Sequence, residues 1–92
     1  MKVNVAHLSA RARSGGSINF AVFDARSSSG SREDNSRLLA QLTARARASN
    51  LRVDQSALVY RAGGRNEYFG TPSLVEYLST AGVPGWTHTL DV

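Results

Sequence analysis

Two histidines, His7 and His88, are the only side chains in this chain that can both take up and release a proton near neutral pH. Each falls in an expected strand near one end of the chain, and the terminal strands of a small sheet often lie side by side. Two facing imidazoles with an arginine nearby would form an acid–base pair able to cleave RNA without a metal ion. No spacing rule marks these two as catalytic, and two ordinary strand histidines fit as well. The sequence therefore assigns no catalytic residue.

Other kinds of chemical site lack their residues in this sequence. The chain has no cysteine, and two isolated histidines fall short of a structural zinc set. The glycine-containing stretch Ser14–Ser17 lacks the lysine of a phosphate-binding loop, and it leads into a strand rather than a helix. The acidic side chains are scattered, so no pair of catalytic carboxylates stands out. We expect neither a metal nor a cofactor.

Arginine accounts for ten of the eleven basic residues, and the net charge is +4. The planar guanidinium grips carboxylates and phosphates better than the lysine ammonium does. If the two expected hairpins lie side by side, the arginines at their tips form one cationic rim for phosphates or for an acidic protein surface. The four arginines that flank the two Gly-Gly turns are Arg11, Arg13, Arg61 and Arg65. A GC-rich coding sequence, which favours arginine over lysine, is the competing explanation.

Two tyrosines, Tyr60 and Tyr68, lie near the second of these turns. Aromatic rings beside cations can stack on bases, as they do in sheet-based RNA-binding domains. Packing across the strands is the alternative, and the chain carries neither an RNA-binding signature nor a helix-turn-helix pattern. The expected partner-binding residues are therefore Arg11, Arg13, Tyr60, Arg61, Arg65 and Tyr68.

Alternating apolar positions predict five strands, and apolar residues three and four apart predict two helices. The strands are expected at residues 3–13, 18–25, 51–62, 65–69 and 86–92. The first helix follows a polar loop over residues 26–31, with Ser31 or Asp34 as its N-cap. The second helix begins at Thr71 and ends at Gly82.

The element order β-β-α-β-β-α-β predicts a single α+β domain over residues 1–92. We expect a two-layer sandwich in which a largely antiparallel sheet carries both helices on one face. Two short amphipathic helices can cover only one face, so the other face stays open to solvent or to a partner. An exposed edge strand offers a second route to a partner, and a homodimer would cover such an edge.

The composition is that of a globular protein, with 41% hydrophobic and 20% charged residues. No membrane span and no signal peptide are visible, so we expect a cytoplasmic protein that does not bind membranes. We expect it to be a non-enzymatic interaction protein, an inhibitor or adaptor of the kind that phages and bacteria encode. It would bind an acidic surface on a larger protein through the open sheet face or an edge strand and the arginine rim. The alternatives are a nucleic-acid-binding domain that uses the same arginines, and a small metal-free ribonuclease that uses His7 and His88.

Overall fold

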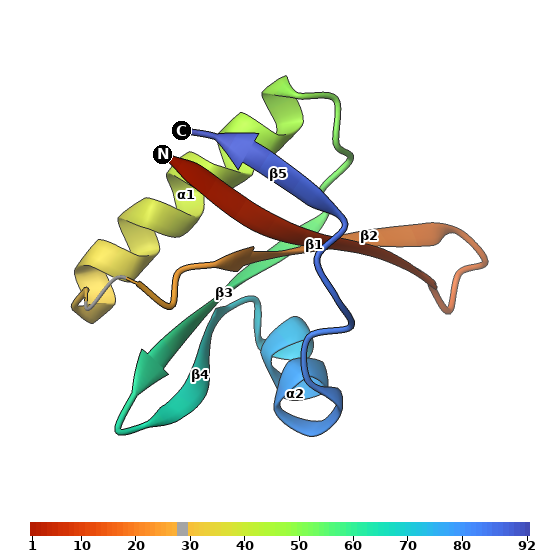
Figure 1. Ribbon diagram of the computed structural model, residues 1–92. Helices are drawn as coiled ribbons and strands as arrows, with labels where there is room; N and C mark the ends of the chain where they lie inside the picture. The colour runs from red at the N-terminus through yellow and green to blue at the C-terminus, as the bar shows by residue number, and fades with distance from the viewer. Residues whose placement is uncertain (28–29) are drawn as a thin grey trace.

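The computed structural model describes residues 1–27 and 30–92 and has the expected order of elements (Figure 1). The strands are β1 (Lys2–Arg11), β2 (Ser17–Asp24), β3 (Gln55–Ala62), β4 (Arg65–Gly70) and β5 (His88–Asp91). The helices are α1 (Arg32–Ala48) and α2 (Pro72–Ala81), and neither is long and apolar enough to cross a membrane. The expected α+β fold is confirmed. Two positions of the expected polar loop, 28 and 29, lie outside the described residues.

The strands form one sheet in the order β4-β3-β2-β1-β5. Neighbouring strands are antiparallel except for β2 and β3, which run parallel with Phe20 opposite Gln55 and Asp24 opposite Val59. The parallel pair depends on α1, because the helix carries the chain back along the length of the sheet before β3 begins. Strands β3, β2 and β1 therefore occupy the interior of the sheet, and β4 and β5 form its two edges.

The two helices lie on opposite faces of the sheet, so the expectation that both cover one face is wrong (Figure 1). On β2, Phe23 packs in a core with α1, while its neighbour Val22 packs in a second core with α2. Successive residues of a strand point to opposite faces, and on β3 Leu58 and Val59 divide between the two cores in the same way. The centre of the sheet is covered on both sides, and the expected open face is wrong as well.

Local contacts fix both ends of α1. At its start, Ser31 Oγ accepts the Asp34 N–H at 3.2 Å, and the Asp34 carboxylate accepts the Ser31 N–H at 3.4 Å. This capping box satisfies backbone donors that the first turn would otherwise leave unpaired. At its end, Arg47 Nη2 donates to Val53 O at 2.9 Å and ties the helix to the segment before β3. The start of α1 is thereby held in a fixed place close to the β4 edge.

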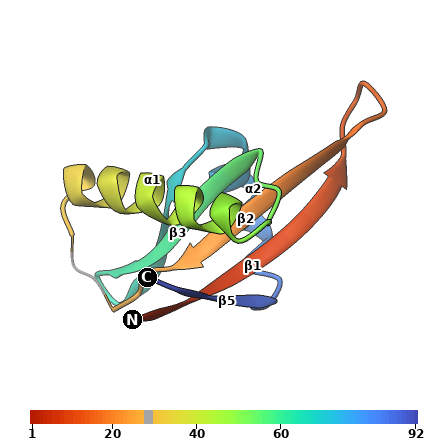
Figure 2. The same ribbon diagram turned by 90° about the horizontal axis from the view of Figure 1, so that it is seen from above.

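The two hairpin turns lie at opposite ends of the sheet. The β1–β2 turn over residues 12–16 precedes β2, and the β3–β4 turn at residues 63–64 follows β3. Because β2 and β3 run parallel, the start of one and the end of the other are at opposite ends. The β1–β2 hairpin extends beyond both helices (Figure 2). The expectation that the hairpin tips form one rim is therefore wrong.

Candidate functional site

Strand β4 forms one edge of the sheet, and within the described residues nothing pairs with its outer side. Thr71, the residue after the strand, donates its N–H inward to Ser56 O at 3.2 Å. Alternate residues of a strand direct their backbone groups to the same side, so Tyr68 and Asn66 direct theirs outward. Such a row of unpaired N–H and C=O groups is a template for pairing with another chain.

Gly70, at the end of β4, lies directly against the backbone of β3. A Cβ atom at this position would come within 2.4 Å of Ser56 O and 2.6 Å of Ala57 Cα, and the backbone φ is +151°. Only glycine fits so close an approach in this conformation. Gly70 therefore holds the end of β4 tightly on β3 while the chain turns into α2.

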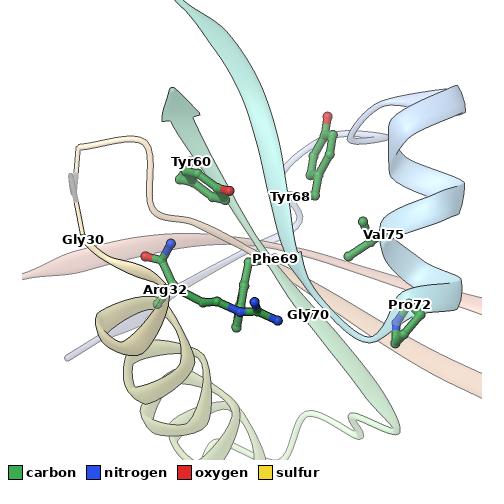
Figure 3. A pocket seen from close by; sticks show the side chains of 9 residues that line it. Gly30, Arg32, Tyr60, Tyr68, Phe69, Gly70, Pro72 and Val75 are labelled. Atoms are coloured by element: carbon green, nitrogen blue, oxygen red, sulfur yellow. The ribbon is translucent and has the colours of Figure 1, made fainter. Parts of the chain in front are cut away.

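A hollow of about 500 Å³ lies beside the β4 edge (Figure 3). Its lining combines the start of α1, the aromatic residues of β3 and β4, and the first turn of α2: Gly30, Arg32, Asn35, Tyr60, Tyr68, Phe69, Gly70, Pro72 and Val75. In Figure 3 the Arg32 side chain extends from the start of α1 toward β4. The hollow thus brings a cation and several aromatic rings to the unpaired edge.

The aromatic side chains near this edge alternate between the two faces of the sheet. Tyr68 is opposite Val59 and packs against the α2 core. Phe69 is opposite Leu58, which belongs to the α1 core, and Tyr60 lies two residues after Leu58 on the same face. The side chains of a strand laid along β4 would alternate in the same way. Successive side chains of that strand would therefore meet the two sides of the hollow in turn.

The arginines near β4 differ in how far they are already engaged. Arg61 donates from Nη1 to Asn66 Oδ1 at 3.2 Å and from Nη2 to a turn carbonyl oxygen at 2.9 Å. Arg65 lies 3.8 Å from the Glu67 carboxylate, an exposed pair that contributes little to stability. In the described part of the chain, no residue forms a hydrogen bond or ion pair with the Arg32 side chain. Arg32 is therefore the arginine of the hollow that a partner can engage without displacing an existing contact.

The six residues expected to bind a partner separate into two groups. Arg11 and Arg13 belong to the β1–β2 hairpin, at the far end of the sheet from β4. The second group adjoins β4 and consists of Tyr60, Arg61, Arg65 and Tyr68. The cause of the separation is the parallel pairing of β2 with β3.

The hollow also includes Phe69, Pro72 and Val75, which are not among the residues expected to bind a partner. The two-residue turn at 63–64 was a signal that could have placed Phe69, because it fixes the register of β3 against β4. No comparable signal places Pro72 and Val75, whose position depends on the face that α2 covers.

On the other half of the sheet, the two histidines come together. The ring centroids of His7 and His88 are 5.8 Å apart, and the ring planes meet at 76°. The antiparallel pairing of β1 with β5 causes this proximity, because it puts His88 opposite Val5 and hence near His7 on the same face. The terminal strands of this sheet therefore do lie side by side.

Arg26 forms an ion pair at the end of β2 and also contacts the segment before β5. Arg26 donates from Nε to Asp24 Oδ1 and from Nη2 to Asp24 Oδ2, both at 3.0 Å. These hydrogen bonds hold the pKa of the Asp24 carboxyl below its usual range. The Arg26 guanidinium also lies 5.5 Å from the ring centroid of Trp86, in reach of a cation–π contact.

No protein-family model, curated protein or solved structure matches the chain. Among residues 1–27 and 30–92, no three His, Asp or Glu side chains are grouped so that they could hold a metal ion. Any functional conclusion therefore depends on the geometry of this chain.

Proposed function

We propose that the protein is an interaction protein that binds a larger protein along β4. An extended segment of the partner would join the sheet as a sixth strand, with main-chain hydrogen bonds providing affinity and side-chain contacts providing specificity. The observation that carries this proposal is the unpaired outer side of β4 beside a hollow of about 500 Å³. An inhibitor or an adaptor could act in this way.

The charges near β4 favour an acidic segment. Arg32 has no partner in the described part of the chain and lines the hollow, while Arg61 and Arg65 lie at the hairpin tip. A guanidinium forms strong, directional hydrogen bonds with a carboxylate, and complementary charge speeds the encounter of two proteins. We therefore propose that the added segment carries Asp or Glu side chains.

Two substitutions of Tyr68 separate backbone pairing from side-chain contact. Tyr68→Pro removes both the ring and the outward N–H, whereas Tyr68→Ala removes only the ring. Edge strands tolerate proline, and thermal melts of both variants would establish that they fold. In capture experiments from a cell lysate, partners held by the wild-type protein and by Tyr68→Ala should bind Tyr68→Pro about tenfold more weakly or worse. Equal capture by the two folded variants would contradict strand addition.

Two double charge-reversal variants test which end of the sheet binds the partner. The double variant Arg61→Glu/Arg65→Glu should weaken capture, because it places carboxylates at the hairpin tip where β4 begins. The matched control Arg11→Glu/Arg13→Glu makes the same change in net charge at the opposite end of the sheet and should leave capture unchanged. Equal weakening by both would indicate a general electrostatic attraction. Steeply salt-dependent retention of RNA or DNA would then support the nucleic-acid-binding alternative.

A second copy of this chain is the competing occupant of the edge, because two β4 strands could pair with each other. Sedimentation of the wild-type protein at several concentrations measures this directly. A dimer that Tyr68→Pro dissociates and Tyr68→Ala preserves would show that the edge joins two copies, and the proposal of a different partner would then fail.

A further inference from the structure

The histidine pair lies on a different part of the sheet from the β4 edge and has a geometry of its own. Each imidazole has one ring nitrogen held by a neighbour. His7 Nε2 is 2.8 Å from Arg52 O, and a carbonyl oxygen can only accept, so Nε2 carries the proton. The neutral His7 ring therefore keeps its lone pair on Nδ1, where it can accept a proton. The tautomer and the orientation of this ring are both set by the Arg52 carbonyl.

One hydroxyl group links the two histidines. Thr87 Oγ1 accepts the backbone N–H of His7 at 2.9 Å and lies 2.8 Å from Nδ1 of His88. The second nitrogen of His88, Nε2, makes no hydrogen bond with the described residues. The Thr87 hydroxyl also donates to Val5 O at 3.3 Å. The Thr87 side chain is therefore held by β1, and it in turn holds the His88 ring. Held rings lose less freedom when a substrate arrives.

An open hollow with charged side chains in its lining lies beside His88. His88 lines a hollow of about 510 Å³ together with Arg45 of α1 and Asp91 of β5, and Arg52 belongs to the segment whose carbonyl holds His7. Arg45 and Asp91 are therefore the charged side chains that line the hollow beside His88. An arginine beside such a hollow suits a phosphate group.

From this arrangement we infer that His7 and His88 are an acid–base pair acting on the phosphodiester bond of RNA. His7 Nδ1 takes the proton of a 2′-hydroxyl, whose oxygen attacks the adjacent phosphorus and forms the new P–O2′ bond. The P–O5′ bond breaks, and protonated His88 gives its Nε2 proton to the departing O5′. The products are a 2′,3′-cyclic phosphate and a 5′-hydroxyl, and both rings regain their starting state by exchanging protons with water. The substrate supplies its own nucleophile, so no protein nucleophile is needed.

The test measures cleavage of the dinucleotide uridylyl-adenosine by the purified full chain in the presence of EDTA. We expect a 2′,3′-cyclic phosphate product, no cleavage of the 2′-deoxy analogue and a rate that passes through a maximum as the pH is varied. His88→Ala and His7→Gln should each lower the rate by about 100-fold or more. Gln offers an N–H to the Arg52 carbonyl but no base, so the His7 variant is designed to keep the fold. Arg13→Ala, on the far hairpin, should cleave as the wild-type protein does.

Two results would overturn the inference. One is no cleavage by a wild-type protein whose thermal melt shows that it is folded. The other is equal cleavage by wild-type protein and by the double variant His7→Gln/His88→Ala prepared in the same way, which would identify a contaminating nuclease. Cleavage of a dinucleotide needs no protein partner, so failure of strand addition and failure of this inference are distinguishable.

Discussion

The two edges of the sheet differ in length and in the side chains they present. Strand β4 has six residues and adjoins a hollow lined by Tyr60, Tyr68 and Phe69, whereas β5 has four residues and buries only Leu90. Short, polar edge strands protect proteins against unwanted pairing with other chains. Strand β5 fits that description and β4 does not. Strand β4 is therefore the edge at which we propose strand addition, and the proposed histidine pair lies on the β5 side of the sheet.

The helices on opposite faces account for much of this difference. On one face, α2 packs Leu74 and Leu78 in a core that Tyr68 of β4 completes. On the other face, Leu90 of β5 packs in the core that contains Leu42 of α1. Because Tyr68 of β4 packs on the α2 core and Leu90 of β5 packs in the α1 core, the two edges should respond differently when one core is weakened.

Among the variants that test the difference between the two edges, Leu78→Ala should have the largest effect. Leu78 is 1% exposed, and its truncation leaves a cavity in the α2 core, so the free energy of unfolding should fall by about 2–5 kcal/mol. Urea denaturation measures this loss. Hydrogen exchange should accelerate more at β4 amides than at β5 amides, because Tyr68 packs on the α2 core.

The matched control is Leu42→Ala, an equally buried leucine in the opposite core. Its stability loss should be similar in size, and the losses should add in the double variant to within about 0.5 kcal/mol because the sites share no contacts. In this variant, hydrogen exchange should accelerate more at β5 amides than at β4 amides. Identical exchange patterns in the two single variants would show that the edges are not supported separately.

A smaller effect is expected at the end of β4 from Gly70→Ala. The added Cβ would lie 2.4 Å from Ser56 O in a conformation that alanine rarely adopts, so β4 must shift away from β3. We expect a loss of about 1–3 kcal/mol in the free energy of unfolding, measured by urea denaturation. Gly64→Ala is the control, because φ is +77° there and nothing lies within 4 Å of the added atom. If the two variants were equally stable, backbone strain alone would explain Gly70, and the close approach to β3 would be irrelevant.

Much of this fold could be predicted from local sequence patterns. The order of the elements, the turns at the Gly-Gly pairs and the capping box at Ser31 follow from residue types within a few positions of each other, and the structure confirms them. The proximity of His7 and His88 was left open by the sequence, and it results from the pairing of β1 with β5.

The arrangement of the elements in space was harder to predict. The runs Ala21–Phe23 and Ala57–Val59 are apolar at every position, which is typical of strands buried on both faces. The expectations that both helices cover one face and that both hairpin tips lie at one end did not use this signal. Which strand becomes the neighbour of β2 depends on long-range packing, and no local spacing determines it. The location of the β4 hollow therefore became visible only with the structure.

The smallest expected effect is the change with pH in the stability that the Arg26–Asp24 ion pair contributes. Because Arg26 donates to its carboxylate, the pKa of Asp24 is lower in the folded chain than in the unfolded chain. The ion pair therefore stabilises the fold fully above the ordinary aspartate pKa of about 3.9, and this contribution disappears as the pH falls through the lowered value. We expect wild-type protein to be more stable than Asp24→Asn near neutral pH and the difference to shrink toward zero in acid.

Thermal melts of the two proteins across the acid range measure that difference, and Trp86, the only tryptophan, reports the loss of the nearby guanidinium through its fluorescence. A difference that persisted in strong acid would assign the role of Asp24 to packing rather than to charge. The stability loss of Gly70→Ala should stay constant over the same range, because its cause is a steric contact between two strands. Acid should therefore loosen the segment before β5 while leaving the β4 edge in place.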